Sequence, residues 1–321
     1  MATGVLPVFC GGASKAVDLQ LNHDKSYRAV LKLGARTDTG DVTGTVLETA
    51  PVTAGEGELL AVLPQFIGPQ MQVPPMYSAI KLNGQPLYKL AREGVTVERK
   101  ARPIEICSIT YGGSPAENEY VLDVTCSKGT YIRTLLEDIA AAMGQKGTMS
   151  ALRRTSAGVY TEADAHTLEE ILAAKEQGMD ALEALMLPVE SVFESLPLLV
   201  VEPWVEQHLY NGCPTSRYPA ADGRYRVRNA AGQFLGLANI VQGVLRVEDT
   251  GFSSNCAMGT TITSTPNGAQ RVRSSSGLPA ALAPKVKFSP QTSARALQSR
   301  TMPSTNCSGV RPLISSKSGV R

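Results

Sequence analysis

The sequence predicts an α+β fold for residues 1–190, followed by a small β-barrel domain over residues 195–249. Two observations predict this order. Strand-like segments and capped helical segments are interspersed up to residue 188. Beyond it, short apolar runs alternate with Gly and Asn turns, which is typical of a small all-β unit. The length of 321 residues also favours about two domains of roughly 100–200 residues each.

The strands and helices expected in the first domain each depend on a local signal. The expected strands have alternating or continuous apolar residues: 27–33, 76–81, 104–111 and 120–126. The expected helices have caps or breakers: 58–66, 87–93, 130–143 and one that the capping box of Thr167 opens. Pro64 ends the first of these early, and Gly94 and Gly144 occupy C′ positions. Between the elements, we expect a polar loop over residues 34–44 and a tight turn at Asn83-Gly84.

The second domain and the tail differ in composition from the first domain. Short strands are expected at 198–201, 225–228, 234–240 and 244–247. Residues 251–321 are rich in Ser, Thr, Pro, Gly and Arg, and have neither acidic residues nor apolar periodicity, so we expect a disordered basic tail. Its composition is typical of a chance or out-of-frame reading; the alternative is a basic RNA-binding extension.

Composition excludes several classes of protein. The six cysteines are scattered without a C-x-x-C pair, which is typical of a reducing cytosol and gives no disulfide or zinc framework. The three histidines are not at metal-ligand spacing, so a histidine metal site is not expected. No run of about 18 apolar residues and no cationic signal peptide occur, so we expect a cytoplasmic protein without a membrane partner.

The net charge of +2 conceals an uneven distribution. The last 71 residues carry nine Lys and Arg and no acidic residue, which leaves 22 Lys and Arg against 29 Asp and Glu over residues 1–250. The folded part is therefore mildly acidic, and any RNA-binding surface must be a local patch.

The run Cys126-Ser127-Lys128-Gly129-Thr130-Tyr131-Ile132-Arg133-Thr134-Leu135 is the most specific in the chain. It predicts a strand, a glycine turn and a helix that Thr130 caps. Tyr131 and Arg133 are two residues apart, so they point in different directions, and one can pack against a base while the other reaches a carboxylate. The alternative is a capped helix with a surface arginine.

This run resembles the signature of the bacterial tRNA pseudouridine-55 synthases of the TruB type. The resemblance extends over roughly residues 1–248, and it also rests on Lys25-Ser26-Tyr27-Arg28, Thr37-Asp38-Thr39-Gly40-Asp41, Pro75-Met76-Tyr77-Ser78-Ala79-Ile80-Lys81 and Leu152-Arg153-Arg154. It implies a mixed, largely antiparallel sheet with flanking helices, which is the pseudouridine synthase fold without its first strands, and a PUA-like second domain. It also implies isomerisation of the T-loop uridine of tRNA, without cofactor or metal, by a monomer.

The resemblance implies roles for particular residues. Tyr27 would stack on the flipped base and take part in the final proton removal, and Tyr131 and Leu152 would wall the pocket. Arg133 would pair with the nucleophilic aspartate, with Asp41 as a second partner. Lys128 would bind substrate, and further phosphate contacts would come from Lys81, Arg92, Arg153 and Arg154. Without the family context, Tyr27 is a core-edge aromatic, Leu152 is packing, the cations are solvated charges, and Asp38 and Asp41 form turns.

The family's nucleophilic aspartate lies in a segment of the form Gly-x-Leu-Asp-Pro-x-Ala-x-Gly-x-Leu, and Met1-Ala2-Thr3-Gly4-Val5-Leu6 aligns with its end. By this alignment, the Asp-Pro pair is expected immediately before Met1. The core-like apolar run 5–9, so close to the start of the chain, also suggests that an upstream segment is missing. The chain as written is expected to lack isomerase activity. We also expect an unpaired sheet edge with exposed apolar surface where the missing strands belong.

Three functions remain open at this point. The first is a tRNA-modifying isomerase, and the second is a non-catalytic tRNA-binding or tRNA-folding protein. The third is a gene fragment without function. Affinity for RNA without product would distinguish the second from the first, and failure to bind tRNA at moderate salt would indicate the third.

Overall fold

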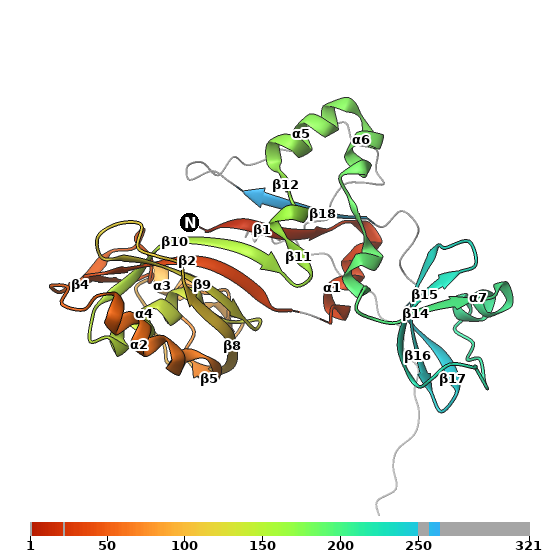
Figure 1. The fold of residues 1–321 in the computed structure, drawn as a ribbon, viewed down its shortest axis with the longest axis horizontal. Helices are drawn as coiled ribbons and strands as arrows, with labels where there is room; N and C mark the ends of the chain where they lie inside the picture. Colours follow the sequence, from red (N-terminus) through yellow and green to blue (C-terminus); the bar gives the residue numbers. More distant parts are fainter. Residues whose placement is uncertain (1, 22, 250–256, 264–321) are drawn as a thin grey trace, which may run out of the picture. The chain divides into compact units, whose positions relative to one another are not determined.

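The computed structural model describes residues 2–21, 23–249 and 257–263, and these residues form a ten-stranded sheet (Figure 1). Its strands run in the order β12-β18-β1-β10-β2-β9-β8-β5, with β11 beside β10 and β13 beside β18. Their bounds are β1 Ala2–Phe9, β2 Lys25–Leu33, β5 Gly68–Gln72, β8 Arg102–Tyr111, β9 Glu119–Cys126, β10 Gly147–Ala157, β11 Tyr160–Thr161, β12 His166–Thr167, β13 Leu187–Pro188 and β18 Ala257–Thr263. The pairs β1–β10 and β12–β18 are parallel and the others antiparallel, which confirms the mixed, largely antiparallel sheet.

Helices flank this sheet and close its main core. The helices of this region are α1 Ala16–Leu19, α2 Glu56–Val62, α3 Leu87–Arg92, α4 Ile132–Ala142, α5 Leu168–Gln177 and α6 Met179–Ala184. Helix α4 contacts β2 and β10, and its apolar face is fully buried at Leu136 and Ile139 against sheet residues such as Leu31 and Leu122. Alternate residues of β9 are buried, as a strand with one face on a core requires. Within the described ranges, no helix is long and apolar enough to cross a membrane.

Two small ribbons lie outside the large sheet. Strand β3, Ala35–Thr37, pairs with β4, Val46–Thr49, so part of the loop expected over residues 34–44 is in fact a strand. Strands β6, Lys81–Leu82, and β7, Gln85–Pro86, flank the turn at Asn83-Gly84. Both turn residues have positive φ, 51° and 83°, which matches a hairpin turn with two left-handed residues.

The strand expected over residues 76–81 is wrong except at Lys81. The carbonyls of Ser78 and Ile80 accept hydrogen bonds from Tyr88 and Leu87, at 3.1 and 2.8 Å. The first N–H groups of a helix have no partner within the helix, so this segment satisfies the start of α3 instead of joining a sheet.

Thr130 is not the N-cap of α4. Its hydroxyl donates to the carbonyl of Ser127 at 3.0 Å, and Tyr131 occupies the N-cap position in an extended conformation. The expected capping box at Thr167 is confirmed, because Thr167 and Glu170 exchange hydrogen bonds of 3.1 and 2.8 Å. Gly94 and Gly144, with φ of 73° and 70°, follow α3 and α4 as expected.

The second sheet consists of β14 Leu198–Val201, β15 Gly223–Asn229, β16 Phe234–Val241 and β17 Val244–Asp249, in that order. All the expected strands are present, but within residues 198–249 the sheet is open and does not close into a barrel. Helix α7, Pro203–Tyr210, was not expected. It buries Val205 and Leu209 in a separate core with strand residues such as Leu235 and Leu245.

The outer edge of β1 is paired rather than open. Residues Gly4–Phe9 of β1 pair with Met258–Thr263 of β18, so the expected unpaired edge is wrong, and so is the expected disorder at residues 257–263. The remainder of the expected tail, 251–256 and 264–321, lies outside the described residues. Apolar exposure remains on β1 at Leu6 and Val8, which are 48% and 42% exposed.

A further core cluster joins β1 to the second sheet. Val5 of β1 and Leu237 of β16 belong to the same buried cluster, together with Phe193. Beside it, the buried carboxylate of Glu190 accepts from Arg226 at 2.7 Å and from Arg228 at 2.8 Å. The second sheet therefore shares both apolar and ionic contacts with the segment at 189–193.

Candidate active site

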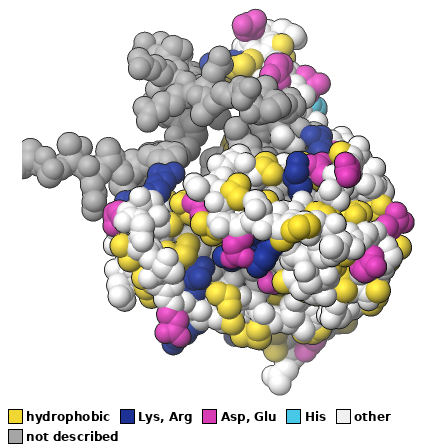
Figure 2. Space-filling model, turned by 90° about the vertical axis from the view of Figure 1, so that its left-hand side faces the viewer, with side chains coloured by type: hydrophobic (Ala, Val, Ile, Leu, Met, Phe, Trp, Pro, Cys, Tyr) yellow, Lys and Arg dark blue, Asp and Glu magenta, His cyan; other side chains and the backbone are white. Residues whose placement is uncertain are grey.

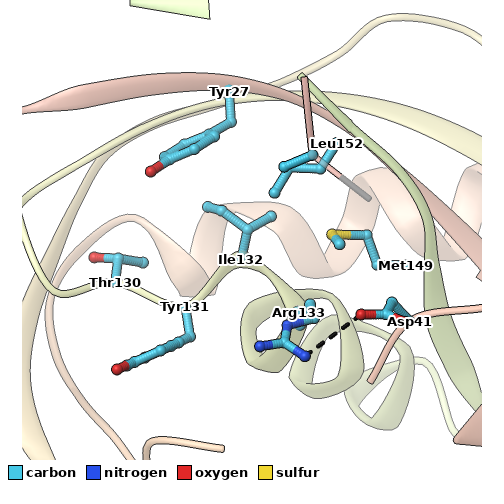
Figure 3. Close-up of a pocket in the computed structure, with 9 residues that line it drawn as sticks. Tyr27, Asp41, Thr130, Tyr131, Ile132, Arg133, Met149 and Leu152 are labelled. Carbon is cyan, nitrogen blue, oxygen red and sulfur yellow. Dashed lines mark hydrogen bonds and ion pairs between the residues drawn. The ribbon is translucent and has the colours of Figure 1, made fainter. Parts of the chain in front are cut away.

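A cavity of about 390 Å³ opens where β1, β2 and β10 meet the start of α4; we call it the first cavity (Figure 3). Its walls combine aromatic, aliphatic and charged side chains. The lining residues are Ala2, Tyr27, Thr130, Tyr131, Ile132, Met149, Leu152, Asp41 and Arg133. The structure thus brings together Tyr27, Asp41, Tyr131, Arg133 and Leu152 from four separate stretches of sequence.

Arg133 is held in the first cavity by three segments. One Nη donates to the carbonyl of Thr39 at 2.6 Å, and the other donates to the carbonyl of Tyr77 at 2.8 Å. The first also lies 3.4 Å from a carboxylate oxygen of Asp41. Gly40 is required at this approach, because it has φ of +72° and a Cβ there would lie 3.3 Å from the Cβ of Arg133.

Asp41 uses most of its hydrogen-bonding capacity within its own loop. One carboxylate oxygen accepts from the Thr43 hydroxyl at 2.5 Å, the Thr43 N–H at 3.1 Å and the Thr39 hydroxyl at 3.0 Å. Burial alone would raise its pKa, but these hydrogen bonds, with the charge of Arg133, hold the pKa of Asp41 below its ordinary value. Asp41 is therefore ionised at neutral pH, and its carboxylate is already bound by Thr39, Thr43 and Arg133.

Tyr27 enters the first cavity from β2, where it pairs with Arg154 of β10 on one side and Val124 of β9 on the other. Figure 3 shows its ring on the opposite side of the cavity from the ring of Tyr131. Burial raises the pKa of Tyr27 above its ordinary value and Cys126 adds to the rise, although Arg154 opposes it. The phenol is accordingly neutral over the physiological range.

None of the other predicted cations lines the first cavity, although Arg154 lies beside Tyr27 in its wall. Arg153 forms an ion pair with Glu162, and Arg154 donates to the carbonyl of Val5 at 2.6 Å. The guanidinium of Arg92 lies 5.4 Å from the ring centre of Tyr88, and Lys81 is exposed on β6. Lys128 lines a different cavity. On the face that Figure 2 presents, basic, acidic and hydrophobic side chains are intermingled, as expected for a mildly acidic domain.

Sequence reasoning did not identify Gln72, a buried residue that holds the backbone of Tyr131 in position. Gln72, 5% exposed at the end of β5, accepts from the N–H of Tyr131 at 2.9 Å and donates to its carbonyl at 3.1 Å. The two residues are 59 positions apart, so no local pattern indicates the pairing. Met149 and Ile132 also line the cavity, and their apolar side chains look like ordinary core positions in the sequence.

The comparisons with known proteins agree with this geometry. The sequence profile described as TruB family pseudouridylate synthase (N terminal domain) matches residues 1–132, and that of the tRNA pseudouridylate synthase B C-terminal domain matches residues 133–194. The protein named tRNA pseudouridine synthase B from Ectopseudomonas mendocina is 44% identical over 243 residues, which cover 75% of this chain and 79% of the relative. The protein of that name from Burkholderia mallei is 40% identical over 255 residues, 77% of this chain and 83% of the relative.

Solved structures agree at the level of the fold. A Cbf5-Nop10-Gar1 complex contains a chain that matches with a TM-score of 0.51 at 17% identity, over 79% of this chain and 69% of the other. The fold and the first cavity together define a pseudouridine synthase. More narrowly, the chain belongs to the TruB family of pseudouridylate synthases.

Proposed function

We propose that this protein is a tRNA pseudouridine(55) synthase whose first cavity receives the T-loop uridine. The observation that carries the proposal is that two tyrosine rings and the aliphatic side chains of Ile132, Met149 and Leu152 line one cavity with an anchored arginine. A base inside a folded loop must leave its stack before an enzyme can act on it, and such a cavity replaces the lost stacking. Because tRNA is the proposed substrate, we also expect a cytoplasmic location.

The aromatic and aliphatic walls hold the base. Tyr27 offers its ring face for stacking, and its raised pKa keeps the phenol neutral, so no phenolate repels the RNA. Tyr131 and Leu152 bound the cavity on its other sides.

The reaction breaks the bond from C1′ of the ribose to N1 of uracil, turns the base and forms the bond from C1′ to C5. C5 then loses its proton and N1 takes one up, so the product is an isomer of the substrate. The reaction requires a carboxylate beside Arg133. Among the described residues that line the cavity, Asp41 is the one acid, and its oxygens are already bound to Thr39, Thr43 and Arg133. Arg133 has five N–H donors, so groups remain for a further carboxylate, the aspartate that the family resemblance implies before Met1.

The test compares the polypeptide of residues 1–321 with the same chain to which a segment of the family's Gly-x-Leu-Asp-Pro form has been added before Met1. Pseudouridine formation is measured by tritium release from tRNA labelled at C5 of uridine. We expect release only with the longer chain, and none when its aspartate is replaced by Asn. Release by residues 1–321 alone would overturn the assignment of the nucleophile, and no release by the longer chain would overturn the proposed activity.

The carboxylate of Asp41 is already bound by Thr39, Thr43 and Arg133, so it is not free to act as the nucleophile. This supports a second candidate function, that of a tRNA-binding protein without catalysis. The polypeptide of residues 1–321 would then bind a T-loop hairpin without forming product. Fluorescence anisotropy with a labelled hairpin distinguishes this candidate from a fragment that binds no RNA at moderate salt.

A further inference from the structure

Arg154 stands in the wall of the first cavity beside the phenol of Tyr27. In β10 it pairs in register with Tyr27 of β2, and residues directly opposite each other on antiparallel strands point to the same face of the sheet. Leu152, two residues before Arg154 on β10, lines the cavity. Arg154 therefore occupies the cavity face of β10, next to Tyr27.

The side chain of Arg154 is anchored on β1. Its Nε donates to the carbonyl of Val5 at 2.6 Å, and Gly4 of β1 pairs with Arg154 in register. A guanidinium has five N–H donors in a rigid fork, so both Nη groups remain after this bond. Within the described part of the chain, Arg154 forms no ion pair that would neutralise its charge. The residue thus links β10 to β1 and presents an uncompensated charge to β2.

The surroundings of the Tyr27 phenol oppose its charged form, except at Arg154. Burial raises the pKa of Tyr27 and the thiol of Cys126 in β9 adds to the rise, whereas the charge of Arg154 and a hydrogen bond from its side chain lower the pKa. The charged groups that line the cavity, Asp41 and Arg133, lie 3.4 Å from one another. Among the described residues that act on the phenol, Arg154 is therefore the one that favours a negative charge on its oxygen.

We propose that Arg154 is a positioning residue for Tyr27, which holds the phenol in the cavity wall and stabilises the negative charge of its oxygen. The proposal rests on the proposed function, because Tyr27 acts on a proton only when a uridine occupies the first cavity. The phenol is neutral at rest, and its ionised form, with the proton released to water, can accept the proton of C5. The C5–H bond then breaks, its electron pair stays in the ring, and the proton joins the phenol oxygen. This role replaces the phosphate contact expected for Arg154 from the sequence.

The first experiment titrates Tyr27 in residues 1–321 without RNA, by ¹⁹F NMR of protein that contains 3-fluorotyrosine. Fluorination lowers the pKa of each phenol and so keeps the titration below the pH of alkaline unfolding, and Tyr27→Phe identifies the signal. We expect Arg154→Gln to raise the pKa of this phenol by about 1, as the removal of an adjacent opposite charge does. Arg154→Lys loses the rigid fork but keeps the charge, and its pKa should lie near the wild-type value.

Arg153→Gln is the matched control for the titration. Arg153 precedes Arg154 on β10 and points to the opposite face, where it pairs in register with Arg28 and forms an ion pair with Glu162. The variant removes the same charge and should leave the pKa of Tyr27 unchanged. An equal rise in Arg153→Gln, or no rise in Arg154→Gln, would overturn the proposal. So would a rise in Arg154→Lys as large as that in Arg154→Gln, because the charge would then not be the cause.

The second experiment measures the binding of a T-loop hairpin to the wild type and to Arg154→Gln as a function of salt. A residue that acts through Tyr27 makes no phosphate contact, so we expect the same slope of log Kd against log salt for both. A slope reduced by about 1 would identify a phosphate contact and overturn the proposal. Absence of binding by the wild type would overturn the proposed function, whereas the titration, which uses no RNA, decides the contact between Arg154 and Tyr27 independently.

Discussion

At the scale of single residues, the site depends on contacts between side chains and backbone. The side-chain amide of Gln72 hydrogen-bonds to both the backbone N–H and the backbone carbonyl of Tyr131, as a neighbouring strand would. Tyr131 in turn lines the first cavity. Arg133 is likewise held by the carbonyls of Thr39 and Tyr77. The side chains of Tyr131 and Arg133 in the first cavity are therefore held by residues that do not line it.

Gln72→Glu tests whether Gln72 positions Tyr131. The glutamate carboxylate can still accept from the Tyr131 N–H, but it has no donor for the Tyr131 carbonyl. One carboxylate oxygen then faces the carbonyl oxygen of Tyr131 without a hydrogen between them. We expect hairpin affinity to fall about tenfold at pH 8 and to recover toward pH 5, because protonation of the glutamate restores a donor. Gln65→Glu, at an exposed position three residues before β5, is the control, and its ratio to wild type should not vary with pH. A pH-independent loss for Gln72→Glu would indicate a structural role only.

Asp41→Asn should alter stability in a way that depends on pH. The pKa of Asp41 is lowered in the folded protein, so its contribution is complete above its unfolded pKa of about 3.9 and is lost as pH falls through the lower folded value. We expect a loss of about 1–2 kcal/mol at pH 7, which shrinks toward pH 3. Urea unfolding at both pH values measures it, with Asp18→Asn on the exposed face of α1 as the control. A loss that is equal at both pH values would contradict the prediction.

At the scale of elements, the contact of β1 with β10 fixes the floor of the first cavity. Gly4 is buried with φ of +106°, and a Cβ at this position would lie 2.1 Å from the carbonyl oxygen of Arg154. The two strands can therefore approach only where this residue is glycine. Ala2 lies at the end of the same pairing and lines the cavity.

Gly4→Ala is expected to destabilise the protein by about 2–4 kcal/mol, because both the positive φ and the clash with backbone oppose it. Thermal unfolding measures the change. Gly57→Ala is the control, because no atom lies within 4 Å of the added Cβ in helix α2, and we expect no loss there. If both variants unfold at the wild-type temperature, β1 does not pack on β10 as described.

Local signals predicted most elements, and hydrogen bonds that the residue pattern does not indicate decided the exceptions. The paired strands around residues 104–126 and the capping box at Thr167 depend on neighbouring residues, and they are confirmed. The segment at 76–81 failed because it serves the start of α3, and Thr130 failed because its hydroxyl turns back to Ser127. Tyr27, Tyr131, Leu152 and Arg133 were found through the family resemblance, whereas the role of Gln72 could be found only from the fold.

At the scale of the whole molecule, the boundary expected near residue 190 is bridged by shared contacts. Val5 and Leu237 belong to one cluster, and the Glu190 carboxylate, 6% exposed, is bound by Arg226 and Arg228. Removal of one partner of a buried ion pair leaves the remaining charges without compensation. The second sheet is therefore expected to unfold together with the first.

Differential scanning calorimetry tests this coupling. We expect one unfolding transition for the wild type and a lower, broadened or divided one for Glu190→Gln, with a loss of about 2–3 kcal/mol. Glu183→Gln, at an exposed position of α6, is the control and should leave the transition unchanged. Two transitions in the wild type would show that the shared contacts do not couple the sheets.

The parallel pairing of β1 with β10 also constrains biosynthesis. Val5 and Arg154, which share a 2.6 Å hydrogen bond, are 149 residues apart. At about 5–20 residues per second, the ribosome needs roughly 7–30 s to deliver the second after the first. During that interval the apolar residues of β1 have no partner strand. The contact between β1 and β10 at the first cavity can therefore form only after about half of the chain has been synthesised.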